Sequence, residues 1–375
     1  MKNEVDINNN ILIWAVERAG LSLDKIAEKI PNFSAWLEGK KKPTIKQLEN
    51  FSRKVHLPFG YLFLETIPTE TIPIPYFRKG NNNNVSLNVY DTVLILQQRM
   101  LWLREYLRDA GEPSLSFVGS YAQNMNVDEV AQNIRTTLNL NEDWARESST
   151  WEDTLKNLTL KVEGIGINVV FNSVVGNNTH RAIDVDECRG FVLTDEFAPF
   201  MFINSADSKA AQMFTIVHEL AHIWIGKSAG FDLRELTPAD DAIEIFCNRV
   251  AAEFLIPKSA LDAQWQQNNR DIKKLARYFK VSQLVIARRL LDLTYIEKNE
   301  FIEFYSGYIQ RIKNKKEKQK DGGGDFYKTQ NRRIGLQFAN YIRFALKENK
   351  ILYRDAWQLT GLNGNTFENF LNQLN

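Results

Sequence analysis

Met213-Phe-Thr-Ile-Val-His-Glu-Leu-Ala-His-Ile-Trp224 is the stretch on which the interpretation of this 375-residue sequence depends. It holds His218 and His222, four residues apart, in an apolar and helix-forming context. At this spacing two side chains lie on one helix face about 6 Å apart, so both imidazoles can reach one metal ion, and zinc prefers such ligands. Glu219 is turned by roughly 100° from that face, where a carboxylate can act on water without ligating the metal. The stretch therefore predicts a metal-binding helix.

The bulk composition is that of an ordinary globular protein. Hydrophobic residues make up 44% of the chain and charged residues 25%, and the length suggests two or three domains. The net charge of +1 gives no global field that favours nucleic acid or a membrane. Cys188 and Cys247 form neither a metal-ligand pair nor a disulfide framework. Without an apolar signal segment or membrane span, we expect a cytoplasmic protein, and a peptidase there must be selective.

Short apolar runs lead into the histidine stretch. Residues 167–171, 190–193 and 200–204 are bounded by turn residues and predict β-strands. Asp207 is the expected N-cap of the helix that follows. Strands followed by a metal-bearing helix predict a small α+β unit, in which a strand edge could hold an extended peptide by backbone hydrogen bonds.

A second helix carries the next candidate ligand. Residues 237–241 read Thr-Pro-Ala-Asp-Asp, with a proline and acids typical of a first turn, and predict a helix over 239–256. Within it, Glu244 and Asn248 are four residues apart and share a face. An open tetrahedral zinc site requires such a third ligand, steadied by a polar partner.

The N-terminal region predicts short helices over residues 11–66. Its pattern Trp36-x-x-Gly39-Lys-x-x-Pro43-Thr44-x-x-x-Leu48 resembles the second half of a phage-repressor (Xre-type) helix-turn-helix. Residues 31–35 are too few for the two or three turns of a recognition helix in the major groove. Two interpretations of this region remain open. It could contact DNA, with the lysine triplet 40–42 on phosphates, or it could have a purely structural or protein-binding role.

Helices are also expected along the rest of the chain. Prolines at 68, 73 and 75 enforce an extended linker, and helices should follow at 87–110, 127–138 and 151–158. The pair 272–279 and 281–291 has helix-turn-helix proportions, which more often serve packing than DNA. In the C-terminal third, residues 310–320 predict a basic helix end or linker, and residues 321–330 predict a flexible break. Terminal helices are expected at 334–346 and 351–375.

Stretches over most of the chain share one family pattern. They are Arg189-Gly-Phe through Pro199, Asn204, Phe214-Thr-x-x-His218-Glu-Leu-Ala-His222, Glu244-x-x-x-Asn248-Arg-x-Ala-Ala-Glu-x-Leu-Ile-Pro257 and Val281-Ser-x-x-x-x-x-Arg288-Arg-Leu. With the N-terminal helices and proline linker, they resemble the ImmA/IrrE family of bacterial and phage metallopeptidases. The resemblance implies His218, His222 and Glu244 as zinc ligands, Glu219 as general base and Asn248 as a supporting residue. Phe246 and Cys247 replace the family's common Glu and Ala, which leaves the ligand set intact.

The resemblance implies a zinc-dependent metalloendopeptidase that cleaves a regulatory protein. A transcriptional repressor is the expected substrate, in a stress, mobile-element or toxin–antitoxin setting. The alternative is a non-catalytic antitoxin-like or DNA-binding regulator that acts by binding a partner, such as a toxin-like protein. Two plainer interpretations make the histidines ordinary core residues, or make the zinc purely structural or ligand-sensing.

Three further residues have both a functional and a plain interpretation. His180 could stabilise a developing oxyanion or be a surface histidine. Cys247 is expected to pack in the core, and Glu253 to support the ligands or to be a plain helix charge, with the plain charge favoured.

The expected fold class is α+β and predominantly helical. Its centre is a small zincin-like core, a short sheet with two metal-bearing helices, flanked by helical domains. The expected domains are an Xre-like helical domain, a proline linker with helices, the metallopeptidase core, a helix-turn-helix-like region and a C-terminal helical module, at 1–66, 67–150, 151–260, 261–320 and 321–375.

Overall fold

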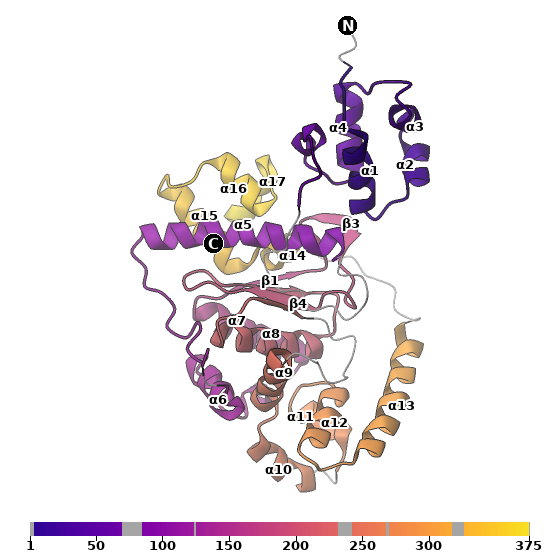
Figure 1. Cartoon of the computed structure of the whole chain (residues 1–375). Coiled ribbons are helices and arrows are strands. Elements are labelled where there is room, and N and C mark those ends of the chain that lie inside the picture. Colours follow the sequence, from indigo (N-terminus) through magenta and orange to yellow (C-terminus); the bar gives the residue numbers. More distant parts are fainter. Residues whose placement is uncertain are drawn as a thin grey trace. The chain divides into compact units, whose positions relative to one another are not determined.

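The computed structural model describes residues 4–69, 85–123, 125–231, 242–267, 270–316 and 326–374. These residues divide into two compact units, one of residues 4–69 and 85–91 and the other of the residues from 92 onward. The fold is mostly helical with a small sheet, which confirms the predicted fold class (Figure 1). Among the described helices, none is both long and apolar enough to cross a membrane.

The first unit is a set of short helices. They are α1 (Asn9–Arg18), α2 (Leu23–Lys29), α3 (Phe33–Leu37), α4 (Ile45–Lys54) and the 3-10 helix η1 (Phe59–Phe63). Ser22 caps α2, and Thr44 caps α4 in a capping box with Gln47. Phe33 and Phe51 stack at the centre of the core, with ring centroids 5.5 Å apart. Helix α3 is only five residues long, and whether this unit is a helix-turn-helix stays a prediction.

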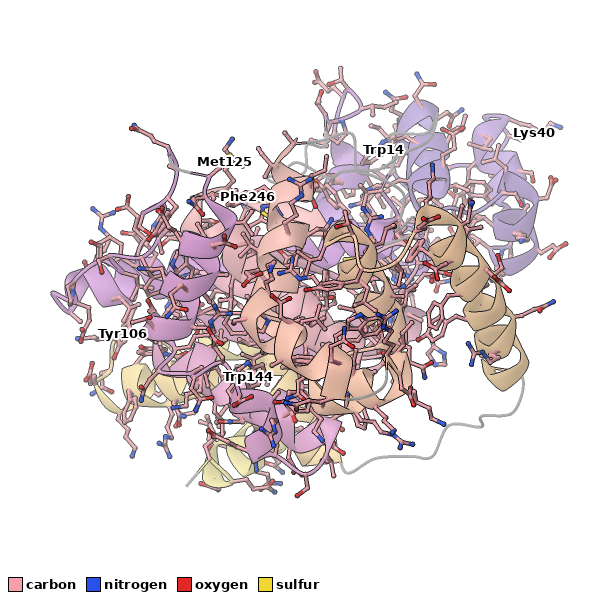
Figure 2. The ribbon with its side chains drawn as sticks, turned by 90° about the horizontal axis from the view of Figure 1, so that it is seen from below. Trp14, Lys40, Tyr106, Met125, Trp144 and Phe246 are labelled. Carbon is pink, nitrogen blue, oxygen red and sulfur yellow. The ribbon has the colours of Figure 1, made fainter. Side chains whose placement is uncertain are left out.

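The lysine triplet of the first unit is paired within its own chain. Lys40 lies 2.6 Å from Glu38 and Lys42 lies 2.7 Å from Asp6. Lys41 donates to Asn32 Oδ1 at 3.0 Å. Figure 2 shows Lys40 pointing outward, with 73% of its side chain exposed. Such exposed pairs are weak, and they give two of the three lysines an acidic partner within their own unit.

The second unit is built on a four-stranded sheet. Its order is β1-β5-β4-β6, with β1 (Asn168–Asn172), β5 (Phe200–Asn204), β4 (Gly190–Leu193) and β6 (Ala229–Phe231). Strands β1 and β5 are parallel, whereas β4 is antiparallel to both β5 and β6. Every residue of β1, β4 and β5 is buried, which explains why they appear as continuous apolar runs. The three predicted strands are thus confirmed, and a separate hairpin of β2 (Val174–Val175) and β3 (Asn178–Ala182) was not predicted.

Helices cover both faces of this sheet (Figure 1). On one face lie α7 (Trp151–Gly164), α8 (Lys209–Trp224) and α9 (Ala242–Leu255), which share the largest apolar core with the strands. On the other lie α5 (Leu87–Asp109), of which the part from Thr92 belongs to this unit, α14 (Phe326–Ile334) and α15 (Leu336–Lys347). Peripheral helices complete the unit, namely α6 (Val127–Thr137), η2 (Trp144–Glu147), α10 (Lys258–Gln267), α11 (Ile272–Tyr278), α12 (Gln283–Asp292), α13 (Lys298–Lys316), α16 (Tyr353–Thr360) and α17 (Gly364–Asn372).

One prediction in the C-terminal third is wrong. A flexible break was expected over 321–330, but residues 326–330 form the first half of α14. Gln330 is fully buried, and the guanidinium of Arg332 lies 4.6 Å from the ring centroid of Phe171 on β1. Packing against the sheet therefore stabilises a polar segment as a helix, which local composition could not show. Residues 321–325 lie outside the described part.

Candidate metal centre

Helix α8 begins at a serine cap. Ser208 has the extended backbone of an N-cap, and its hydroxyl accepts from the Ala211 N–H at 3.3 Å. The predicted cap, Asp207, is wrong because its carboxylate is engaged by Arg189 at 2.6 Å. That ion pair ties the start of α8 to the residue before β4. Arg189 belongs to the family pattern, but the sequence does not reveal that Asp207 is its partner.

A glycine lets α8 lie close against the sheet. A Cβ added at Gly190 on β4 would stand 2.4 Å from Thr215 Cγ2 and 2.8 Å from the Phe202 carbonyl oxygen. Thr215 is one turn before His218 and Glu219 on α8. Any larger residue at 190 would push this turn away from the strand, so the glycine helps to place the histidine-bearing helix.

The structure brings the three predicted ligands together in a buried cluster. His218 Nε2 lies 3.1 Å from His222 Nε2, and each lies 3.2 Å from an oxygen of Glu244. Both histidines are fully buried and Glu244 is 6% exposed. Ligand atoms at about 2.0–2.2 Å from a tetrahedral zinc ion stand roughly 3.4 Å from one another. The separations in the cluster therefore fit a shared divalent cation.

The charges of the cluster also suit a cation. Burial lowers the pKa of His218, although Glu244 opposes this shift, so the imidazole stays in its neutral form. Burial alone would raise the pKa of Glu244, but the ring nitrogens of His218 and His222 beside it lower that pKa to about 2. Neutral imidazole and ionised carboxylate are the forms that ligate metals.

Asn248 contacts one of the histidines. Its Oδ1 lies 3.2 Å from Nδ1 of His218. An Nδ1–H that donates to this oxygen leaves the lone pair of Nε2 facing the cluster. Asn248 can thereby fix both the tautomer and the ring orientation of His218.

Glu219 is buried beside the cluster. It is fully buried, and neither carboxylate oxygen has a hydrogen-bond partner among the described residues. Burial, and then the charge of Glu244, raise the pKa of Glu219 well above its usual value. A buried carboxyl without hydrogen bonds costs free energy and is characteristic of a group that exchanges protons with a bound molecule.

The three further candidate residues, His180, Cys247 and Glu253, lie outside this cluster. His180 is exposed on β3, in accord with a surface histidine. Cys247 is fully buried in the core, as expected. Glu253 is not a plain helix charge, because it forms an ion pair with Arg289 of α12 and so joins α9 to that helix. The predicted helix start at 237–241 lies outside the described residues, and α9 is described from Ala242.

Asn204 acquires a role that its sequence position alone did not reveal. Its buried Nδ2 donates to the carbonyl oxygens of Ile183 and Cys188 at 3.1 and 2.9 Å. These bonds hold the segment that leads into β4, and with it Gly190. A polar residue at the end of an otherwise apolar strand was the available signal.

The residues of this cluster lie within a stretch that matches the model of a peptidase family. Residues 162–291 match the family model of the IrrE N-terminal-like domain (Peptidase_M78), which spans β1 to α12 and includes all five candidate site residues. This match supports the resemblance to ImmA/IrrE metallopeptidases, a family that implies a bound metal. Residues 334–373 match a second model, a domain of unknown function (DUF8813). No curated protein matches the sequence.

Proposed function

We propose that the chain is a zinc-dependent metalloendopeptidase that cleaves a specific regulatory protein. One observation carries the proposal: three ligand atoms converge beside a buried carboxyl, Glu219, that has no hydrogen-bond partner among the described residues. In a cluster made only for packing, we would expect the ligand atoms to lie apart and the carboxyl to have hydrogen-bond partners. The peptidase-family match over residues 162–291 supports the same conclusion.

The residues divide the work of peptide hydrolysis. His218, His222 and Glu244 would hold zinc, which supplies a Lewis acid that polarises the scissile carbonyl and acidifies water. Glu219 takes the proton of the attacking water and returns it to the leaving amine. Asn248 holds the ring of His218 in its ligating orientation.

The substrate class follows from the sheet and from the ImmA/IrrE resemblance. Strand β6 follows α8 and forms one edge of the described sheet, where an extended peptide could pair by backbone hydrogen bonds. This favours cleavage within an extended segment of a protein. The resemblance favours a transcriptional repressor in a stress, mobile-element or toxin–antitoxin setting.

Cleavage of regulators encoded beside this gene, followed by intact mass spectrometry, tests the proposal. The wild type should cut one of them, and Glu219→Gln should reduce the rate on the order of 1,000-fold while retaining its zinc. Glu112→Gln, which changes an exposed carboxyl, is the matched control and should cut like the wild type. Equal cleavage by wild type and Glu219→Gln would contradict the proposed base. Stable binding of a neighbour without cleavage would favour the non-catalytic regulator.

A further inference from the structure

Three described pairs of helices have helix-turn-helix proportions: α2–α3, α11–α12 and α16–α17. A pair that reads DNA needs a second helix of two to three turns with an open outer face. Helix α3 has five residues, which is too short. Helix α12 is long enough, but residues 283–291 are all buried or half-buried. Helix α17 has nine residues and a row of exposed side chains, so of these three pairs α16–α17 satisfies both conditions.

We propose that α15, α16 and α17 form a helix-turn-helix module that binds double-stranded DNA, with α17 as its recognition helix. Helix α16 ends at Thr360 and α17 begins at Gly364, which leaves a three-residue turn. Gly361 opens this turn with φ +70°, a left-handed conformation that glycine adopts without strain. The helix-turn-helix motif is defined by a first helix, a three-residue turn that contains glycine, and a second helix.

Buried side chains on the three helices leave one face of α17 turned outward. The buried side chains are Phe338 and Ile342 on α15, Ala356 and Leu359 on α16, and Phe367 and Phe370 on α17. Tyr353 contacts Phe367 edge to face, with centroids 6.3 Å apart. Arg343 donates to the Leu374 carbonyl at 3.2 Å and ties α15 to the end of α17. Because Phe367 and Phe370 point inward, the opposite side of α17 faces solvent.

The outer face of α17 carries side chains that can read base edges. Asn365, Glu368, Asn369 and Asn372 are exposed, and their spacing places them along one side of the helix. Asparagine can bond both N6 and N7 of adenine, and glutamate can accept from N4 of cytosine in the major groove. This set therefore suits sequence readout better than non-specific phosphate binding.

The module offers one exposed arginine and two helix N-termini that can contact phosphate groups. Residues 336–374, which hold the three helices, carry four basic and three acidic side chains. Arg354, in the first turn of α16, has 84% of its side chain exposed and lies 3.4 Å from Asp355. Neither α16 nor α17 has a side-chain hydrogen bond at its N-cap, so their first backbone N–H groups can meet phosphate oxygens.

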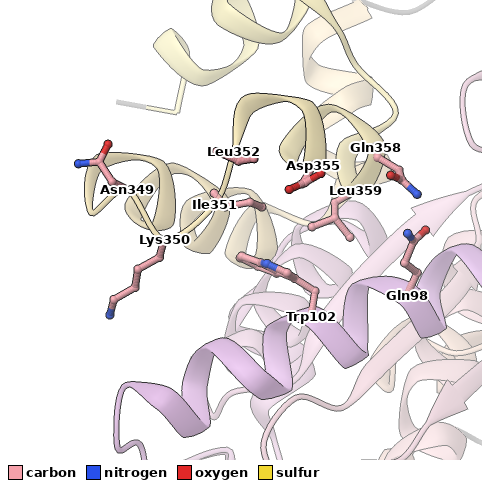
Figure 3. A pocket seen from close by; sticks show the side chains of 9 residues that line it. All are labelled: Gln98, Trp102, Asn349, Lys350, Ile351, Leu352, Asp355, Gln358 and Leu359. Atoms are coloured by element: carbon pink, nitrogen blue, oxygen red, sulfur yellow. The ribbon is translucent and has the colours of Figure 1, made fainter.

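The module is fixed to the sheet-bearing part of the second unit. Arg99 on α5 donates to the Leu359 carbonyl at 2.8 Å, and Asn177 donates to the Gly361 carbonyl at 3.3 Å. Figure 3 shows Trp102 of α5 beneath Ile351 and Leu359, where they line a hollow of about 400 Å³. DNA held by α17 would therefore keep a fixed orientation to the metal centre. The binding of DNA does not depend on the proposed peptidase activity.

Selection of bound duplexes from a random-sequence library, using the full chain, tests the proposal. We expect one enriched sequence, bound at least about 1,000-fold more tightly than a scrambled duplex in fluorescence anisotropy. Replacing Asn365 and Asn369 by Ala should lower the affinity for the enriched duplex by about 5- to 100-fold per lost contact. The affinity for the scrambled duplex should stay unchanged. Arg354→Ala should lower the affinity for both duplexes equally, and the salt dependence of that affinity should fall by about one phosphate contact.

Two controls keep the test specific. Asn299→Ala changes an exposed asparagine on α13 and should bind like the wild type. Replacing Lys40, Lys41 and Lys42 by Ala tests the first unit and should also leave binding unchanged. The proposal fails if no sequence is enriched, if the lysine variant abolishes binding, or if the α17 variant binds normally. It fails equally if RNA of the same sequence competes as well as DNA. Because Ala favours helix, the α17 variants should fold, which circular dichroism would verify.

Discussion

Two buried polar clusters on opposite faces of the sheet differ in whether the protein alone satisfies them. Arg99, on α5, is nearly fully buried and donates to three carbonyl oxygens, those of Leu359, Arg333 and Ile334. The cluster of His218, His222 and Glu244 instead directs ring nitrogens and carboxylate oxygens at one point. The first is complete as it stands, whereas the second would be completed by the cation of the proposed function. The difference separates a contact that builds the fold from one that serves chemistry.

The Arg99 site also shows how a lone buried charge is tolerated. Burial lowers the pKa of Arg99 to about 10, which still leaves it charged near neutral pH. Its three acceptors lie at or near the C-terminal ends of α14 and α16, where unpaired carbonyls concentrate partial negative charge. The guanidinium therefore joins two helix ends of the C-terminal module to α5.

The largest effect should come from removing a ligand of the incomplete cluster. His222→Ala should weaken zinc binding by roughly 3–4 kcal/mol, on the order of 1,000-fold, because zinc-site free energies of about 10–16 kcal/mol are shared among few ligands. His180→Ala changes an exposed histidine and should bind zinc like the wild type. Competition with a chromophoric chelator measures both, and His222→Gln provides a variant that better fills the site. Unchanged affinity in the His222 variants would show that the cluster is merely packed.

The complete cluster should respond in stability, not in metal binding. Arg99→Met should lower the free energy of unfolding by about 2–3 kcal/mol, because three buried carbonyls lose their donors. Arg104→Met is the matched control on the same helix, and its partly exposed pair with Asp195 should contribute less than about 1 kcal/mol. Urea unfolding gives both values, with zinc affinity measured in parallel. A larger loss for Arg104→Met would reverse the assignment of Arg99 as the anchor.

The sequence predicted what depends on short-range patterns. The His218–His222 spacing and the Glu244–Asn248 spacing fixed which side chains share a helix face, and the apolar runs located three of the strands. Buried helix faces and buried strands carry continuous apolar signals, so their positions can be read from a single chain. Family resemblance then supplied the expectation that the two helices meet at one metal.

What the sequence missed depends on long-range partners. Asp207 looked like a cap, but Arg189, 18 residues away, engages its carboxylate. Glu253 looked like a surface charge, but Arg289 on another helix binds it. The start of α14 looked like a break, but the sheet stabilises it as a helix. In each case local propensity was overridden by a contact that no periodicity reveals.

A smaller effect on the incomplete cluster should come from its supporting residue. Asn248→Ala removes the acceptor 3.2 Å from His218 Nδ1 and should weaken zinc binding by about 10- to 100-fold. Arg249→Ala, an exposed neighbour on the same helix, should have no effect on affinity. Equal affinities of the two variants would show that the ring of His218 is held by packing alone.

The smallest effect should be a pH-dependent one at a helix contact that belongs to neither cluster. Glu163 on α7 lies beside Gln337 of α15; burial raises its pKa to about 7, although the Gln337 backbone N–H opposes the shift. Because the folded pKa exceeds the usual 4.5, this carboxyl supports the fold fully below about pH 4.5 and loses that contribution as pH rises through 7. Glu163→Gln should therefore match the wild type near pH 5 and exceed it at pH 8 by roughly 1–2 kcal/mol, allowing for partial exposure. Thermal unfolding at the two pH values, with Glu112→Gln as the exposed control, measures the difference. A pH-independent difference would mean that burial does not penalise the charged form of Glu163 at this contact.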